Sequence, residues 1–147
     1  ALARLADVEE LIKSTNFYKN KSKNLISCAR RLDEKHDGVV PQNLEQLVDL
    51  AGVGRKTANV VLGNAYNIAS GIVVDTHVSR LAQRLGWSSK KDPEKIESDL
   101  SKIIKKKDWV LISHLLISHG RGICKARNPD CDGCFLIEQC PKIFKNK

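Results

Sequence analysis

Four of the five cysteines in this chain lie close together near its C-terminus and could hold a metal centre. Cys124, Cys131, Cys134 and Cys140 follow the pattern Cys-x6-Cys-x2-Cys-x5-Cys. Four thiolates can bind one tetrahedral zinc ion or a four-iron cluster. Zinc ribbons usually pair two short Cys-x2–4-Cys knuckles, and only Cys131 and Cys134 form one here. The longer arms therefore favour an iron–sulfur cluster over zinc, and cysteines without any metal are the third interpretation.

A second candidate site is a short turn with two glycines in the middle of the chain. Gly52 and Gly54 lie one residue apart, between segments whose apolar residues recur at helical spacing. Glycine leaves its amide uncovered and adopts positive φ easily. A helix–Gly-x-Gly–helix turn can therefore direct bare N–H groups at a phosphate from the start of the second helix. Arg55 and Lys56 add charge there, although such a pattern alone is more often a plain turn.

Two further cations lie in the first arm of the cysteine segment. Lys125 and Arg127 stand between Cys124 and Cys131, so a metal centre that pins this loop would present their charges together. A rigid basic loop can bind phosphates, although ordinary surface charge is the simpler interpretation. The whole chain carries 25 Lys and Arg against 17 Asp and Glu, a formal charge of +8. This balance favours an anionic partner, with nucleic acid ahead of a membrane surface.

The elements that must position these residues are all expected to be helices. Asp75 or Thr76 is expected to cap one of them. A basic connector is expected over residues 17–24, and a polar link at 67–71 divides a domain at 1–70 from one at 71–147. Apolar spacing predicts helices near residues 8–12, 25–35, 41–50, 55–65, 78–85, 93–104 and 109–117, the last apolar nearly all round and therefore buried.

The chain shows no segment that would direct it to a membrane or out of the cell. It has no apolar run long enough for a transmembrane helix and no signal-peptide pattern, which predicts an intracellular protein. It contains no methionine at all, so it is expected to begin inside a longer protein.

Taken together and in this order, the motifs resemble the endonuclease III family of DNA glycosylases. The resemblance covers the whole chain and implies two all-α domains on either side of a DNA-binding cleft. One domain would carry a helix–hairpin–helix motif and the other a structural 4Fe–4S cluster held by the four cysteines, which decides between iron and zinc. The motifs that carry it are Leu50-x-Gly-Val-Gly-Arg-Lys-Thr-Ala-Asn-Val-Val61, Val74-Asp-Thr-His77, His119-Gly-Arg121 and the cysteine pattern.

The resemblance also implies roles for single residues. Lys56 matches the lysine that attacks C1′ of the damaged nucleotide and forms a Schiff base. Asp75 matches the carboxylate that stabilises positive charge on the sugar. The implied enzyme removes damaged bases, chiefly oxidised pyrimidines, from double-stranded DNA, nicks the abasic strand by β-elimination, and acts as a monomer. The implied DNA contacts are Gly52, Val53, Gly54, Arg55, Lys125 and Arg127.

The chain departs from the family pattern in two respects. Ala51 stands where the family usually has proline, which predicts a more flexible hairpin. The chain also begins late, without the N-terminal helices that supply the residues filling the gap left by a flipped base. A DNA-binding module without catalysis, a glycosylase for mismatched uracil or thymine, and an unrelated zinc-ribbon protein are therefore the alternatives. Lys56 argues for combined glycosylase and lyase activity, because the adenine-excising relatives typically lack a lysine there.

Overall fold

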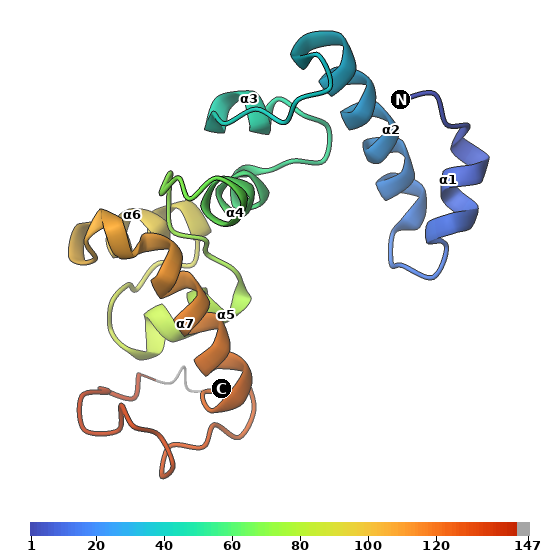
Figure 1. Cartoon of the computed structure of the whole chain (residues 1–147). Helices are drawn as coiled ribbons and strands as arrows, with labels where there is room; N and C mark the ends of the chain where they lie inside the picture. Colours follow the sequence, from blue (N-terminus) through green and yellow to red (C-terminus); the bar gives the residue numbers. More distant parts are fainter. Residues whose placement is uncertain (144–147) are drawn as a thin grey trace. The chain divides into compact units, whose positions relative to one another are not determined.

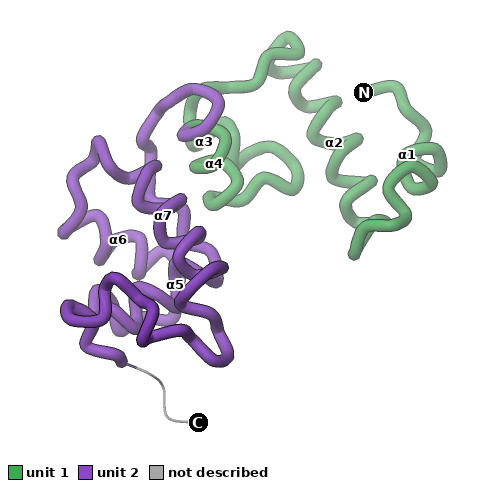
Figure 2. Tube along the Cα trace, turned by 60° about the horizontal axis from the view of Figure 1, so that its bottom comes forward, with its two compact units in different colours: residues 1–62 green, residues 63–147 purple. Residues whose placement is uncertain are grey.

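The computed structural model describes residues 1–143, and this part of the chain is built from helices without any strand (Figure 1). The predicted all-α class is confirmed. The chain divides into two compact units, Ala1–Leu62 and Gly63–Lys147 (Figure 2). The elements in order are α1 (Leu5–Ile12), α2 (Tyr18–His36), α3 (Leu44–Val48), α4 (Arg55–Ala65), α5 (Thr76–Arg84), α6 (Pro93–Ile103), the short 3-10 helix η1 (Lys106–Asp108) and α7 (Trp109–Gly122).

In unit 1, α1 and α2 form an antiparallel pair (Figure 1). The expected connector over residues 17–24 is wrong, because α2 already begins at Tyr18. The reversal is confined to a tight turn in which Phe17 has a φ of 59°. Lysine and asparagine are tolerated on the solvent face of a helix. Ser22 is small enough to be buried beside them, and its hydroxyl donates to the Tyr18 carbonyl at 2.8 Å.

The helix before the glycine turn is shorter than the sequence predicts. The expected start is Pro41, but α3 begins at Leu44, after an N-cap in which the Asn43 Oδ1 accepts from the Gln46 amide at 3.1 Å. The asparagine cap gives one of the first amides of the helix a hydrogen-bond acceptor, which a helix that began at Pro41 would lack. Beyond α3, Asp49 pairs with Arg31 of α2 at 2.7 Å. These contacts hold the segment that leads into the glycine turn.

Unit 2 is organised around α5, which packs on α7 and α6. The predicted cap is confirmed at Asp75, which caps α5. Asp92 caps α6 in the same way, with Pro93 at the first position of that helix. The extended segment before α5 contributes its apolar side chains to the same core. The buried core residues are Ile72, Val74, Val78, Leu81, Ala82, Ile96, Leu100 and Leu116.

The prediction that α7 is buried on all sides is wrong. Leu111 and Leu115 are 55% and 54% exposed, whereas Ser113 and Gly120 are buried. The side turned toward the core carries Leu116 as well as these two small residues, which let α7 approach α5 closely. A Cβ added at Gly120 would lie 3.0 Å from His77 Cβ. Apolar composition therefore does not reveal which face of this helix is covered.

The division between the units falls inside α4, earlier than the polar link at residues 67–71. The last turn of α4 contacts α7 of unit 2. A Cβ added at Gly63 would lie 3.0 Å from Val110 Cγ2, and the Asn64 Oδ1 is 2.9 Å from the His114 Nε2. Packing rather than composition thus sets this boundary. None of the helices described is both long and apolar enough to cross a lipid bilayer.

Candidate functional site

The glycine turn of unit 1 is a tight turn backed by α2. Gly52 has a φ of +78°, and a Cβ at this position would lie 2.9 Å from Asn24 Cβ. The Val53 amide closes the turn by donating to the Leu50 carbonyl at 3.1 Å. A Cβ added at Gly54 would meet no atom within 4 Å, so the backbone is open on that side. The turn therefore has the shape that lets a bulky anion reach backbone amides.

Lys56 lies in the first turn of α4, immediately after this hairpin. Its side chain is exposed, as are those of Arg55 and Thr57. A helix leaves its first N–H groups without partners inside the helix and carries a partial positive charge at this end. Lys56 therefore stands beside the partly positive end of α4, in unit 1.

Asp75 begins α5 in unit 2 and has one oxygen committed to the helix. Its Oδ1 accepts from the amides of His77 and Val78, at 2.8 and 2.9 Å. Its Oδ2 has no hydrogen-bond partner among the described residues. Val74, the residue before Asp75, is buried and anchors the backbone there. The backbone thus fixes the orientation of the carboxylate and leaves one oxygen available for chemistry.

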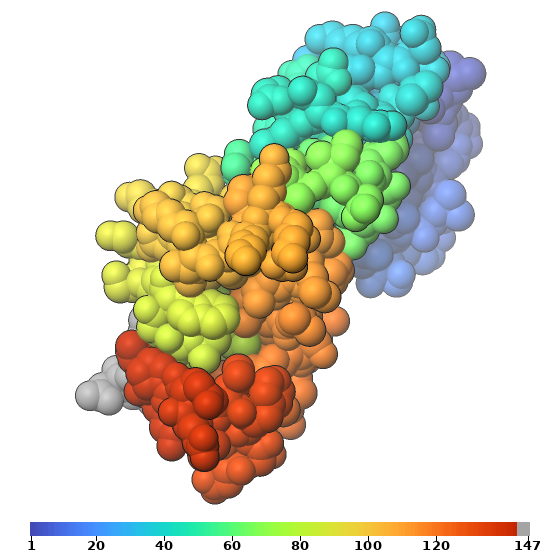
Figure 3. Space-filling model, turned by 60° about the vertical axis from the view of Figure 1, so that its left-hand side comes forward, coloured from blue at the N-terminus to red at the C-terminus, as the bar shows by residue number. Residues whose placement is uncertain are grey.

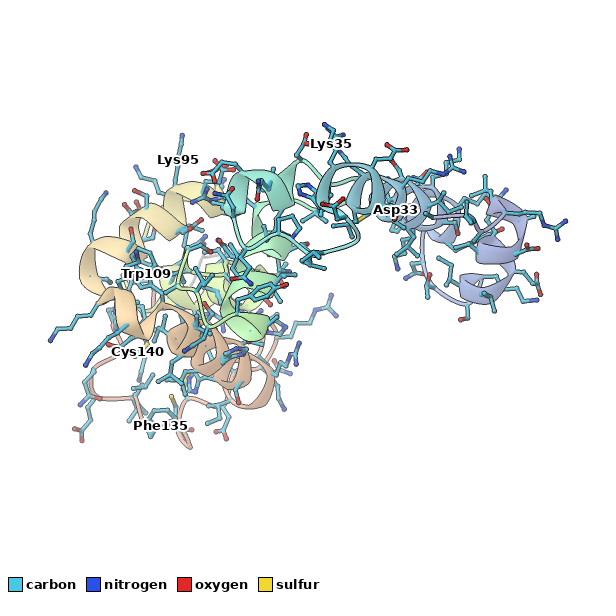
Figure 4. The ribbon with its side chains drawn as sticks, turned by 45° about the horizontal axis from the view of Figure 1, so that its top comes forward. Asp33, Lys35, Lys95, Trp109, Phe135 and Cys140 are labelled. Atoms are coloured by element: carbon cyan, nitrogen blue, oxygen red, sulfur yellow. The ribbon has the colours of Figure 1, made fainter. Side chains whose placement is uncertain are left out.

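All four clustered cysteines line one cavity in unit 2, on the loop that follows α7 (Figure 4 labels Cys140 and Phe135 there). None of the described cysteines forms a disulfide. No three His, Cys, Asp or Glu side chains within residues 1–143 converge closely enough to share one metal ion. Thiols spread around a cavity suit a cluster of several atoms better than a single ion. The apolar part of the lining is Leu81, Leu85, Ile123, Pro129, Leu136 and Ile137.

His119 closes one side of this cavity. Its ring meets that of Phe135 edge-on, with centroids 5.3 Å apart, and its Nε2 lies 3.6 Å from the Cys134 Sγ. Its Nδ1 is buried and has no hydrogen-bond partner among the described residues. Burial lowers the pKa of His119, which favours the neutral ring beside the thiol.

Two arginines of α5 hold the start of the cysteine loop, and sequence reasoning missed both. Arg80 donates to the carbonyls of Gly120 and Cys124, at 2.7 and 3.0 Å through Nη2. Arg84 donates to the Cys124 Sγ at 3.2 Å and to the Lys125 carbonyl at 2.7 Å. Burial, followed by the charge of Arg84, lowers the pKa of Arg80. The available signal is their four-residue spacing in the last turns of an amphipathic helix.

The first arm of the loop is held against α5 by Arg84, and Figure 3 shows the red end of the cysteine loop beside the yellow-green helix. Lys125 and Arg127 are exposed, as their proposed role requires. Arg127 also lines a groove whose walls carry four cations and no carboxylate. The groove is lined by Thr76, Ser79, Arg80, Gln83, Arg84, Lys91, Ala126, Arg127, Asn128, Pro129 and Ile143. Unit 2 thus offers a surface suited to a polyanion.

Two family models together match most of the chain. The model described as "HhH-GPD superfamily base excision DNA repair protein" matches residues 1–106. The model described as "Iron-sulfur binding domain of endonuclease III" matches residues 124–140, the span of the four cysteines. This match settles the choice between zinc and iron in favour of a 4Fe–4S cluster.

Relatives and solved structures agree with these matches. Endonuclease III of Synechocystis is 51% identical over 92% of this chain and 62% of its own length, and that of Thermotoga maritima is 41% identical over 95% and 65%. The chain thus spans somewhat less than two thirds of these relatives.

Among solved structures, "Structure of a non-covalent Endonuclease III-DNA Complex" and a trapped endonuclease III–DNA covalent intermediate superpose with TM-scores of 0.89 and 0.90. Each is 40% identical to this chain, over 95% of it and 65% and 66% of the solved chain, respectively. A thermostable thymine-DNA glycosylase, 22% identical with a TM-score of 0.76, shares the fold. The chain therefore belongs to the HhH-GPD superfamily of base excision DNA repair proteins and, within it, to the endonuclease III family.

Proposed function

We propose that the protein is a DNA glycosylase with abasic-site lyase activity, in which Lys56 and Asp75 carry the chemistry. The observation that carries this proposal is the carboxylate of Asp75, which is held by two backbone amides through one oxygen while the other stays without a hydrogen-bond partner in the described chain. Membership of the endonuclease III family and a relative trapped as a covalent DNA intermediate support the lyase half.

The proposed reaction begins with rupture of the bond between the sugar and the damaged base. Positive charge develops on the sugar as the base leaves with the bonding electrons, and the carboxylate of Asp75 stabilises that charge. The neutral amine of Lys56 forms a bond to C1′ as the base leaves, and the nitrogen then loses one proton. The C1′–O4′ bond breaks next, O4′ takes up a proton, and the nitrogen lone pair forms the C=N bond of a protonated Schiff base. Loss of a proton from C2′ then expels the 3′ phosphate and cuts the strand. A target base must leave the helical stack for this attack.

The cysteines Cys124, Cys131, Cys134 and Cys140 are proposed to hold the 4Fe–4S cluster. They share one apolar-walled cavity, and cysteine thiolates are the usual ligands of such a cluster. The cluster supplies structure and takes no part in bond breaking. Its effect is to fix the loop that presents Lys125 and Arg127.

Double-stranded DNA containing a damaged base or an abasic site is the proposed partner, bound by a monomer. The hairpin contacts would come from Gly52, Val53, Gly54 and Arg55, and those of the cluster loop from Lys125 and Arg127. Phosphate contacts release counterions, so affinity should fall steeply with salt. The double variant Lys125→Gln/Arg127→Gln should reduce the slope of log affinity against log salt by about 2, at about 0.9 per contact. An unchanged slope would remove the cluster loop from the interface.

Borohydride trapping on a duplex with one abasic site tests the central claim. The parent should form a covalent adduct, and Lys56→Ala should form none. Lys95→Ala is the matched control, because Lys95 is also an exposed lysine on a helix, in this case α6. An adduct that persists in Lys56→Ala would assign the Schiff base to another amine. A folded, cluster-loaded parent that binds the duplex but forms no adduct would support the DNA-binding module without catalysis.

Oxidised pyrimidines are the proposed lesion class. The competing class, uracil or thymine opposite guanine, is represented among the solved structures by a glycosylase that shares only the fold at 22% identity. Excision rates on matched duplexes with an oxidised pyrimidine, a mispaired uracil or a mispaired thymine decide between the two. Faster release of mispaired thymine would reverse the proposed preference.

A further inference from the structure

The side chain of Arg84 donates hydrogen bonds to the beginning of the cysteine loop. The guanidinium Nη1 donates to the Cys124 Sγ at 3.2 Å and to the Lys125 carbonyl at 2.7 Å. The Nη2 donates to the Ala126 carbonyl at 3.1 Å. Three consecutive residues of the loop are therefore tied to one side chain in the last turn of α5.

The backbone of the same residue meets the other end of the loop. The Arg84 carbonyl accepts from the Ile143 amide at 3.2 Å and lies 3.8 Å from the Cys140 Sγ. Cys124 and Cys140 are the first and last cysteines of the pattern. One residue of α5 thus contacts both of them, and it lines the cavity that all four share.

The group that Arg84 presents to the Cys124 sulfur differs chemically from the groups that meet the sulfurs of Cys134 and Cys140. Guanidinium is cationic at every accessible pH, and a charge-assisted hydrogen bond to a thiolate is stronger than a neutral one. Cys134 meets the ring of His119, and Cys140 faces a carbonyl. Of these three sulfurs, that of Cys124 is therefore the one with a permanently cationic donor.

We propose that Arg84 is a positioning residue for the cluster, which holds Cys124 as a thiolate ligand and raises the reduction potential of the centre. Hydrogen bonds to cluster sulfurs and nearby charge are among the factors that set such potentials. Adding an electron increases the negative charge on the sulfurs, so a cation that donates to one of them favours the reduced form. This inference concerns the cluster alone and stands whether or not the chain cleaves DNA.

Three variants of the full, cluster-loaded chain separate the contributions. Arg84→Gln removes the charge, and Arg84→Lys keeps the charge but loses the planar fork of donors. Arg80→Lys is the matched control, because Arg80 lies one turn earlier on α5 and directs its guanidinium at the carbonyls of Gly120 and Cys124 and at the ring of His77. The measured quantities are the reduction potential at an electrode and the rate at which a chelator bleaches the visible absorbance.

Arg84→Gln should shift the potential to a more negative value and bleach about tenfold faster, the lower end of the effect of removing an outer-shell partner. Arg84→Lys should shift the potential in the same direction by less, and Arg80→Lys should keep the parent potential. Parent-like potentials in both Arg84 variants, or an equal shift in Arg80→Lys, would overturn the proposal.

A measurement on the parent keeps the test decisive if the substitutions prevent assembly of the cluster. With arginine labelled by nitrogen-15 and the cluster brought to an odd-electron state at the electrode, pulsed electron paramagnetic resonance should detect a guanidinium nitrogen coupled to the cluster. The absence of any such coupling would overturn the proposal, since a donor 3.2 Å from a ligand sulfur is close enough to be seen.

Discussion

The helix cap that Asp75 forms and the reacting role proposed for its carboxylate can be separated by comparing Asp75→Asn with Asp75→Ala. Asparagine caps a helix about as well as aspartate, because its side-chain oxygen can accept the same two amide hydrogens. It lacks the negative charge that the sugar requires. Alanine lacks both the oxygen and the charge.

The contacts of Asp75 determine how much unfolding free energy each variant is expected to lose. In Asp75→Ala the amides of His77 and Val78 lose their bonds of 2.8 and 2.9 Å, and loss of such a cap costs about 1 kcal/mol of unfolding free energy. Both variants also lose an anion at the positive end of α5, which costs about 0.5 kcal/mol at a partly exposed site. We therefore expect unfolding free energies lowered by about 0.5 kcal/mol for asparagine and about 1.5 kcal/mol for alanine.

Base excision should respond differently. Removal of one group that stabilises developing charge costs about 100- to 1,000-fold in rate, so both variants should lose excision to a similar extent. The assays are single-turnover excision from a duplex with an oxidised pyrimidine, and urea unfolding followed by the helical signal and the visible absorbance of the cluster. Parent-like excision by Asp75→Asn would refute the reacting role, and parent-like stability of Asp75→Ala would refute the cap.

Gly52→Ala should destabilise unit 1 by about 1–3 kcal/mol, since φ is +78° and the added Cβ would meet Asn24 at 2.9 Å. Gly54→Ala, with open space around it, is the control, and equal urea midpoints would contradict the strain. A hydrogen bond from Ser88 at 2.8 Å lowers the pKa of Asp99, so the stability that this carboxylate contributes is complete above about pH 4 and is lost as the pH falls through the lowered folded-state pKa. The variant Asp99→Asn should lack this acid-dependent part of the loss of stability, measured by urea titrations at about pH 7 and about pH 3. An equal drop in unfolding free energy between the two pH values in parent and variant would contradict the contribution of Asp99.

The parts of the structure that the sequence predicts well are those specified by local chemistry. Asp75 and Asp92 precede apolar helical patterns, and a short acceptor at that position captures the first free amides whatever the rest of the fold does. The extent of α4 is predictable for the same reason, because Gly54 and the polar residues after Ala65 limit the helix from both sides.

The parts that could not be predicted depend on which surfaces meet. Nothing local distinguishes the exposed Leu111 from the buried Leu116 on α7, since only the approach of α5 decides between them. The basic and polar residues after Phe17 have the composition of a loop. They nevertheless belong to α2, because lysine and asparagine are tolerated on the exposed face of a helix. The four-residue spacing of Arg80 and Arg84 places both on one face of α5, but it does not identify their partners, since those of Arg84 lie about forty residues further along the chain.

The position of Arg84 links the cysteine loop to Asp75, because the two residues lie at opposite ends of α5. The helix α5 has 9 residues, and an isolated helix of that length is unstable in water. Asp75 satisfies the amides at its first turn, and the cysteine loop binds its last turn through the side chain and the carbonyl of Arg84. Because the carboxylate proposed to react is also the cap of this helix, its orientation depends on the helix being formed. A rigid loop at the far end of α5 is therefore part of what holds Asp75 in place.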